Sequence, residues 1–200
     1  FELIDRLRFY PCITTWVVFN VGWGQHNTVE IVNKVIKYDD TRLINGVTGW
    51  TDRGVGDMYD VHNYPVTSMI LPENNGNRIS VLGEFGGYGW AIKEHIWNPN
   101  MRNWGYKNID GAMALIDSYG RLLYDLETLI AQGLSAAVYT QTTDVEGEVN
   151  GLITYDRKVT KIPEGLLHLM HNRLYEITPV NAVTLIADSQ NGIKNTRLVG

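Results

Sequence analysis

The most informative stretch of the sequence for the fold is Val81-Leu82-Gly83-Glu84-Phe85-Gly86-Gly87. A short apolar run ends in a carboxylate, and glycines follow almost at once. An apolar run bounded by glycine is typical of a strand that is buried on both faces. Such a run places Glu84 where the strand leaves the core, so that its carboxylate can face a cleft. In an α/β barrel, the strand ends at this face carry the chemistry.

Strand and helix patterns alternate along the chain, which predicts βα units around a parallel sheet. The predicted strands lie at residues 13–20, 42–48, 57–62, 79–84 and 135–140. The predicted helices lie at residues 28–38, 109–131 and 163–175, and residues 1–8 have the pattern of the last turns of a helix. We expect residues 1–175 to form one unit and residues 176–200 to form a tail, with a strand at 183–187 that can start a further domain.

The helix at 28–38 has the clearest start signal. Asn27 can cap its first turn, and Glu30 follows three residues later in a capping-box arrangement. Its apolar stripe consists of Val29, Val32, Val35 and Ile36. The order of strands and helices fits an open doubly wound sheet as well as the second half of an eight-stranded barrel.

Composition narrows the class of protein. Hydrophobic residues make up 44% of the chain and charged residues 20%, which is typical of a globular domain. The net charge is −5 without any basic run, so we expect no nucleic-acid partner. No apolar stretch approaches the roughly 18 to 20 residues of a membrane span, so we expect no membrane partner. The single cysteine, Cys12, and the absence of a signal-peptide pattern leave a cytoplasmic and an exported location both open.

Six motifs in order carry a resemblance to a known family. They are Phe19-Asn20-x-Gly22-Trp23-Gly24-Gln25, Thr41-Arg42-Leu43-Ile44, Gly49-Trp50-x-Asp52, Asp60-x-His62-Asn63-Tyr64-Pro65, Gly83-Glu84-Phe85-Gly86-Gly87 and Tyr139-Thr140-Gln141-Thr142-Thr143-Asp144-Val145-Glu146-Gly147-Glu148. This pattern resembles glycoside hydrolase family 2, the family of β-galactosidases, β-glucuronidases and β-mannosidases. The resemblance covers residues from about 10 to 161.

The resemblance implies a (β/α)8 TIM-barrel fold, of which this chain holds only strands four to eight. The family retains anomeric configuration with two carboxylates, which sit about 5 to 5.5 Å apart. Glu84 matches the nucleophile at the end of strand seven. The position of the acid/base, directly after the residue that matches Asn20, is occupied by Val21. A valine cannot donate or accept a proton, so the resemblance implies an impaired glycosidase.

The same motifs imply how a sugar is bound. Asn20 matches an amide that hydrogen-bonds the sugar hydroxyl beside the reacting carbon, and Tyr64 matches a tyrosine that touches the nucleophile carboxylate. The expected pocket further includes Trp23, Trp50, His62, Tyr139 and Gln141, with Trp90 as another candidate for stacking on a sugar. Core packing is the alternative for each aromatic residue, and a structural hydrogen bond is the alternative for His62. Asp144 can simply shape its loop.

Three functional hypotheses follow. The first is hydrolysis of terminal β-linked sugars by a β-galactosidase-type enzyme, impaired by Val21 and by the absence of strands one to three. The second is a carbohydrate-binding protein without catalysis. The third is a barrel part that pairs with an upstream half or with a second copy. No metal or cofactor is expected, because His168 and His171 have no third ligand nearby and no family cation ligand matches this sequence.

Overall fold

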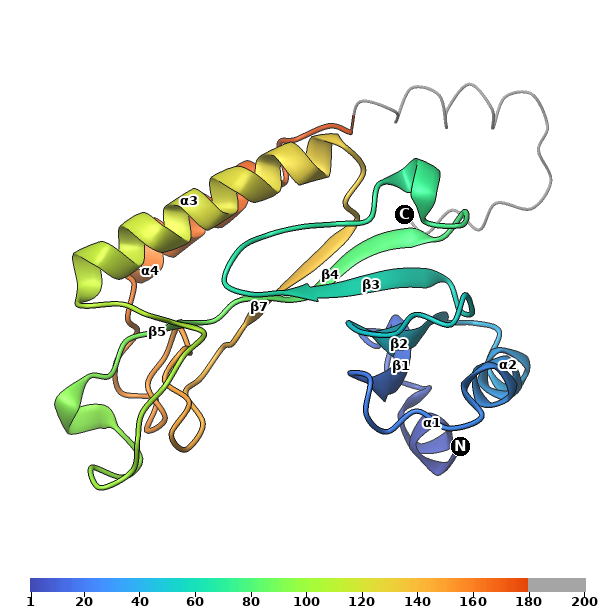
Figure 1. Ribbon diagram of the computed structural model, residues 1–200, viewed down its shortest axis with the longest axis horizontal. Coiled ribbons are helices and arrows are strands. Elements are labelled where there is room, and N and C mark those ends of the chain that lie inside the picture. Colours follow the sequence, from blue (N-terminus) through green and yellow to red (C-terminus); the bar gives the residue numbers. More distant parts are fainter. Residues whose placement is uncertain (180–200) are drawn as a thin grey trace.

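The computed structural model describes residues 1–179 of the chain (Figure 1). It is a mixed α/β structure whose parallel strands form small sheets. The strand expected at 183–187 lies outside the described residues.

Two sheets hold the long strands. β1 (Thr15–Asn20) pairs in parallel with β2 (Leu43–Thr48). β3 (Met58–Asn63), β4 (Ile79–Gly86) and β7 (Ala136–Thr140) form a second parallel sheet in the order β3-β4-β7. A short pair, β5 (Tyr88–Gly89) with β6 (Lys107–Asn108), follows β4. All the long strands predicted within residues 1–179 are therefore confirmed, with shifts of one or two residues at their ends.

The two sheets meet where β2 lies beside β3 (Figure 1). The backbone N–H of Asp57 donates to the carbonyl of Ile44 at 2.7 Å, and the Asp57 carboxylate accepts the N–H of Ile44 at 2.7 Å. Asn45 Nδ2 donates to Asp60 Oδ2 at 2.6 Å. These bonds replace a regular ladder between β2 and β3. The long strands consequently lie side by side in chain order, and within residues 1–179 they do not close into a barrel.

Two helices lie beside β4 and β7 at one end of this arrangement, and two lie beside β1 and β2 at the other end (Figure 1). The α-helices are α1 (Glu2–Leu7), α2 (Thr28–Tyr38), α3 (Ala112–Ala131) and α4 (Glu164–Leu174), and short 3-10 turns occur at η1 (Pro72–Asn74) and η2 (Lys93–His95). α3 packs its apolar stripe, which includes Leu115, Leu122 and Leu126, into a core with Leu82 and Phe85 of β4. None of the helices in residues 1–179 has both the length and the hydrophobicity to cross a bilayer.

The start of α2 differs from the sequence expectation. The predicted bounds are confirmed, but the capping box is wrong: Asn27 adopts a left-handed backbone (φ 44°) and makes no side-chain cap bond. Because of this backbone, only the Asn27 carbonyl serves the helix, by accepting the N–H of Ile31 at 3.0 Å. Glu30 instead pairs with Lys34 at 2.6 Å. In the apolar stripe, Val32 is buried and Val29 is exposed.

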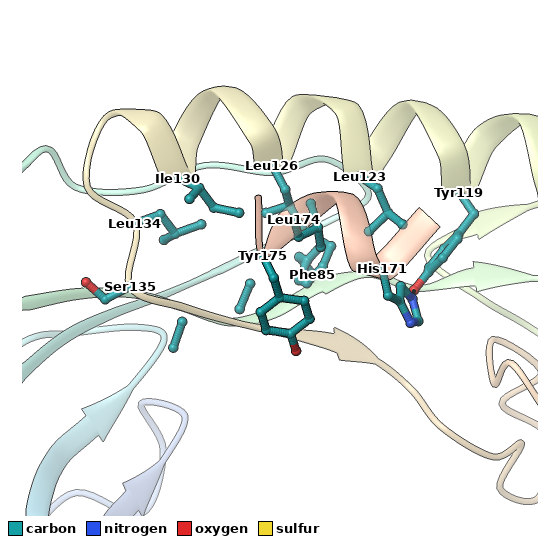
Figure 2. Close-up of a pocket in the computed structure, with 12 residues that line it drawn as sticks. Phe85, Tyr119, Leu123, Leu126, Ile130, Leu134, Ser135, His171, Leu174 and Tyr175 are labelled. Atoms are coloured by element: carbon teal, nitrogen blue, oxygen red, sulfur yellow. Dashed lines mark hydrogen bonds between the residues drawn. The ribbon is translucent and has the colours of Figure 1, made fainter. Parts of the chain in front are cut away.

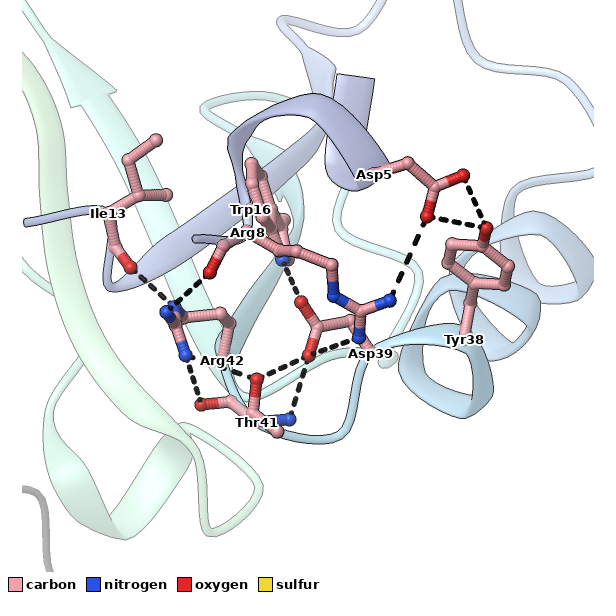
Figure 3. Close-up of polar contacts among 8 residues, drawn as sticks. All are labelled: Asp5, Arg8, Ile13, Trp16, Tyr38, Asp39, Thr41 and Arg42. Carbon is pink, nitrogen blue, oxygen red and sulfur yellow. Dashed lines mark hydrogen bonds and ion pairs between the residues drawn. The ribbon is translucent and has the colours of Figure 1, made fainter. Parts of the chain in front are cut away.

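A buried carboxylate joins α1, β1 and the end of α2 (Figure 3). Asp39 is fully buried, accepts the Trp16 Nε1–H at 2.9 Å, and lies 3.6 Å from the Arg8 guanidinium. Thr41 donates to it through both its backbone N–H and its hydroxyl. Burial alone would raise the pKa of Asp39, but these hydrogen bonds lower it to about 2. Asp39 therefore stays ionised and anchors the N-terminal segment.

Candidate functional site

Glu84 lies near the C-terminal end of β4, where the parallel strands end together. The β3–β4 register places it opposite His62. Its carboxylate Oε2 is 2.7 Å from Tyr64 Oη and 3.3 Å from His62 Nδ1, while 29% of its side chain remains exposed. Glu84 is thus fixed by two neighbouring side chains and still accessible to a ligand.

Tyr64 holds the carboxylate through its phenol. Tyr64 Oη lies 2.7 Å from both Glu84 Oε2 and Thr140 Oγ1. Because a hydroxyl carries one proton, Tyr64 donates to Glu84 and accepts from Thr140. Burial raises the pKa of Tyr64, the hydrogen bond with Thr140 lowers it, and Glu84 raises it further. The phenol consequently stays protonated and remains a donor to Glu84. The expected contact between the two residues is present, and its catalytic role stays a prediction.

His62 is buried, with 1% of its side chain exposed. Its Nδ1 faces Glu84, and its Nε2 lies 3.8 Å from Asp60 Oδ1. Gly49 makes room for the imidazole, because a Cβ at this position would lie 2.6 Å from the ring. The residue expected to line the sugar pocket is therefore placed between two carboxylates, without an open face of its own.

Asp60 is a member of this cluster to which the sequence assigned no role. It is buried, and its oxygens accept the Gly83 N–H at 2.9 Å and the Asn45 amide at 2.6 Å. Gly83 is needed for this approach, because a Cβ there would collide with the carboxylate. Burial raises the pKa of Asp60 although these hydrogen bonds oppose the shift. In the sequence, Asp60 and Gly83 are the first residues of two consecutive motifs, and this was the available signal that Asp60 belongs to the site.

Tyr106 is a second residue that sequence reasoning missed. Its ring stacks flat on Tyr64, with ring centroids 3.6 Å apart and planes at 5°. Burial raises the pKa of Tyr106, and the charges of Glu148 and Glu84 raise it further. Tyr106 belongs to the loop between β4 and α3, which has no periodic pattern, so nothing in the sequence indicated its position.

The end of β1 is tied to the end of β2. Asn20 Oδ1 accepts the hydroxyl of Thr48 at 2.5 Å, and the N–H of Val21 donates to the same hydroxyl at 3.2 Å. Val21 has a φ of 55°, in the left-handed region that β-branched residues rarely adopt. An aliphatic side chain therefore occupies a strained position at a strand end, and strain of this kind is concentrated at functional sites.

The remaining predicted residues divide into exposed and packed ones. Trp23 and Trp50 lie on loops after β1 and β2, with 79% and 53% of their surface exposed. Gln25 connects these loops, since its side-chain amide donates to the carbonyls of Trp50 and Thr51 at 3.3 Å and 3.2 Å. Both tryptophans are accessible to a ligand.

Tyr139 and Gln141, by contrast, are held by the protein itself. The Tyr139 ring packs edge-to-face on Phe85 and Tyr119, and its hydroxyl accepts the N–H of Tyr88 at 3.3 Å. Gln141 donates to Asn150 Oδ1 at 2.9 Å. The Trp90 side chain is half-buried against the core. For Tyr139 and Trp90 the structure shows the packing that was the alternative to stacking on a sugar.

Asp144 shapes the loop after β7. It lies 2.8 Å from Lys161 Nζ in a buried ion pair, and it also accepts the N–H of Gly151 at 2.8 Å. Lys161 donates in addition to the carbonyls of Trp90 and Val149, both at 2.9 Å. This pair fixes the loop that carries Glu148.

A cavity of about 480 Å³ lies between α3, α4 and β7 (Figure 2). Its lining is mostly apolar, and Tyr119 Oη and His171 Nε2 lie 2.8 Å apart there. Within residues 1–179 no three potential ligand side chains gather into a metal site. The cavity offers apolar surface, whereas the groups able to do chemistry gather around Glu84.

The sequence matches no protein-family model, and none of the curated proteins is significantly similar to it. The functional interpretation therefore depends on the motifs and on the geometry around Glu84.

Proposed function

We propose that this chain is the strand-four-to-eight part of a family-2-like retaining β-glycosidase barrel, of β-galactosidase type, with Glu84 as the nucleophile. One observation carries the proposal: an accessible carboxylate at the end of a parallel strand accepts a hydrogen bond from the Tyr64 phenol. Neighbouring parallel strands end beside it, which is the arrangement in which α/β barrels place their chemistry.

The proposed reaction begins when Glu84 attacks the anomeric carbon of a terminal β-linked sugar. A carbon–oxygen bond forms to the carboxylate, the glycosidic bond breaks, and the leaving group departs with the bonding electrons. Water then attacks the same carbon and releases Glu84. Tyr64 orients the carboxylate for the first step, and Asn20 is positioned by Thr48 at the end of β1.

Val21 limits this reaction. A leaving group such as an alkoxide needs a proton as it departs, and water needs a base in the second step. General acid/base catalysis contributes about 10²- to 10⁴-fold to such steps. With Val21 in this position, the proposed enzyme releases efficiently only leaving groups that are stable as anions.

The test uses an aryl β-glycoside with a dinitrophenolate leaving group, which needs no acid. We expect slow release of dinitrophenolate by the intact chain, and loss of that release in Glu84→Gln. Azide should accelerate turnover and yield a glycosyl azide, because the anion attacks the ester without a general base. Release that is equal in Glu84→Gln would rule out Glu84 as the nucleophile.

Carbohydrate binding without turnover is the second candidate, and Val21 is the observation that favours it. This candidate keeps Asn20, Tyr64 and the exposed tryptophans but forms no ester. Binding of methyl β-glycosides, combined with no azide effect on dinitrophenyl glycoside, would support it over catalysis.

Exposed apolar residues on the outer strands favour the third candidate, assembly with further parallel strands. In β7, Val138 is 57% exposed beside Ala136 and Ala137, and Val17 of β1 is 52% exposed. Parallel strands are normally covered on both faces. We propose that another βα segment, upstream or in a second copy, covers them. Sedimentation analysis that shows a well-folded monomer, together with free exchange of the edge-strand amide hydrogens with solvent, would contradict this arrangement.

A further inference from the structure

Three aromatic rings in contact form a line that starts at Glu84 and ends in two partly exposed side chains. Tyr64 touches the carboxylate, and Tyr106 stacks flat on Tyr64 at 3.6 Å between ring centroids. Trp104 then packs edge-to-face on Tyr106, with centroids 5.7 Å apart and planes at 72°. Exposure is 48% for Tyr106 and 39% for Trp104. We call Tyr106 and Trp104 the aromatic platform.

The backbone, and not the rings, holds this platform in place. The N–H of Trp104 donates to the carbonyl of Gly147, and its carbonyl accepts the N–H of Val149, both at 2.8 Å. The N–H of Tyr106 donates to the carbonyl of Gly87 at 2.9 Å. Since the loop is fixed by main-chain bonds, folding does not require a large ring at position 104. Trp104 and Tyr106 form a contiguous, partly exposed apolar patch beside Glu84, and such a patch is a candidate binding surface.

Glu148, a partly exposed carboxylate, lies next to the rings and is backed by the fully buried Asn150. Glu148 and Trp104 form an isolated parallel β-bridge. Glu148 Oε1 also accepts a hydrogen bond from the Asn150 side-chain amide at 2.8 Å. Asn150 in turn accepts from Gln141 at 2.9 Å. The charge of Glu148 also contributes to the raised pKa of Tyr106, which indicates that the two side chains are close. A pyranose has an apolar C–H face and a rim of hydroxyls, so it fits a surface that combines rings with a carboxylate.

The placement distinguishes the two sides of the bond that Glu84 would attack. On the inner side, His62 and Asp60 are buried and close the site. On the platform side, the rings are open to solvent. A leaving group attached to a sugar that Glu84 attacks can therefore extend only toward the partly exposed rings and not toward His62 and Asp60.

We propose that Tyr106 and Trp104 bind the sugar on the leaving-group side of the cleaved bond, so that the site takes a β-linked disaccharide or longer chain. This inference rests on the proposed function, because Glu84 defines the two sides.

The test measures binding in the Glu84→Gln background, which prevents turnover. A panel of β-linked disaccharides with galactosyl, glucosyl, mannosyl or glucuronosyl ends is compared with the matching methyl glycosides. We expect a disaccharide to move the NMR signal of the Trp104 indole N–H, and the methyl glycoside to leave it unchanged. Trp104→Ala should weaken disaccharide binding roughly five- to tenfold without changing methyl glycoside binding, and Trp104→Phe should restore most of it.

Trp97→Ala is the matched control, since Trp97 lies in the same loop, is 56% exposed and packs on Tyr155 at 5.6 Å. It should change neither affinity. The platform is overturned if no disaccharide in the panel moves the Trp104 signal, or if Trp104→Ala binds disaccharide as tightly as its parent. Failure of the proposed function has a different readout: the Trp104 response persists in Glu84→Gln, but the unsubstituted chain forms no glycosyl ester on Glu84.

Discussion

Val21 is the residue on which the proposed activity depends most. Its main-chain N–H is fixed by Thr48, so a different side chain at this position would project from the same strand end. Under the proposed function, this strand end lacks only a side chain that can transfer a proton. Two predictions separate the chemical from the conformational consequence of this valine.

Val21→Glu should increase hydrolysis of an alkyl β-glycoside by roughly 10²-fold or more, because it supplies an acid for the leaving group. Release of dinitrophenolate in the first step should change little, since that group needs no proton. The measurement compares kcat/KM for both substrates. Val21→Gln is the control, because it has a similar shape without a titrating proton; equal rates in the two variants would contradict the assignment.

Val21→Asn should raise the free energy of unfolding by about 1 kcal/mol, because asparagine tolerates left-handed backbone better than a β-branched residue. The backbone φ of 55° at this position is the reason for the expected gain. Urea denaturation measures it. The same change at Val17, inside β1, should give no gain because strands disfavour asparagine. A loss of stability in Val21→Asn would show that the valine side chain outweighs the backbone strain.

Asp60 is predicted to act as a positioning residue. Asp60→Asn turns one acceptor oxygen into a donor, so either the Gly83 N–H or the Asn45 amide loses its partner. We expect a loss of about 1 to 3 kcal/mol in unfolding free energy. We also expect slower dinitrophenolate release, because a shift of Asp60 changes the packing of His62, whose Nδ1 lies 3.3 Å from Glu84. Asp117→Asn, on the exposed surface of α3, is the control, and unchanged release in Asp60→Asn would exclude the role.

At the scale of elements, the sequence predicted most of the scaffold. Helix 28–38 was predicted at its observed bounds because Val32 and Val35 repeat at helical spacing, and the β4 stretch was predicted from its apolar run. The missed features depend on tertiary contacts. The left-handed backbone at Asn27 abolishes the capping box, and the Tyr106 ring reaches Tyr64 from an aperiodic loop. Local patterns contain no information about either contact.

The anchor around Asp39 predicts acid sensitivity. The pKa of Asp39 is about 2 in the folded chain, against 3.8 for an unperturbed aspartate. Because the folded value is the lower one, Asp39 contributes stability fully above about pH 4, and this contribution is lost as the pH falls through about 2. The contribution is on the order of 2 kcal/mol.

Urea titrations between pH 2 and pH 6 measure this contribution. Asp39→Asn should lower stability at pH 6 and reduce the slope between about pH 4 and pH 2. Asp156 also has a lowered pKa, so the difference between the variant and the parent chain isolates Asp39. A slope identical to that of the parent would contradict the assignment.

At the scale of the whole molecule, contacts between neighbouring strands bring the site together. Thr48 of β2 donates a hydrogen bond to Asn20 of β1, and Asn45 of β2 donates one to Asp60 of β3. Glu84 and Tyr64 continue this series toward β7 through Thr140. Parallel strands in chain order therefore bring residues that are far apart in sequence to one edge, which supports a common site for the motifs.

Covalent labelling shows whether Glu84 is the nucleophile. An activated 2-deoxy-2-fluoro β-glycoside with a dinitrophenolate leaving group forms a glycosyl ester that hydrolyses slowly, and mass spectrometry of peptides locates it. We expect one added fluorosugar per chain on the peptide that contains Glu84, and none in Glu84→Gln. Labelling at another residue, or none over a panel of sugars while the folded chain binds the matching methyl glycosides, would contradict this assignment.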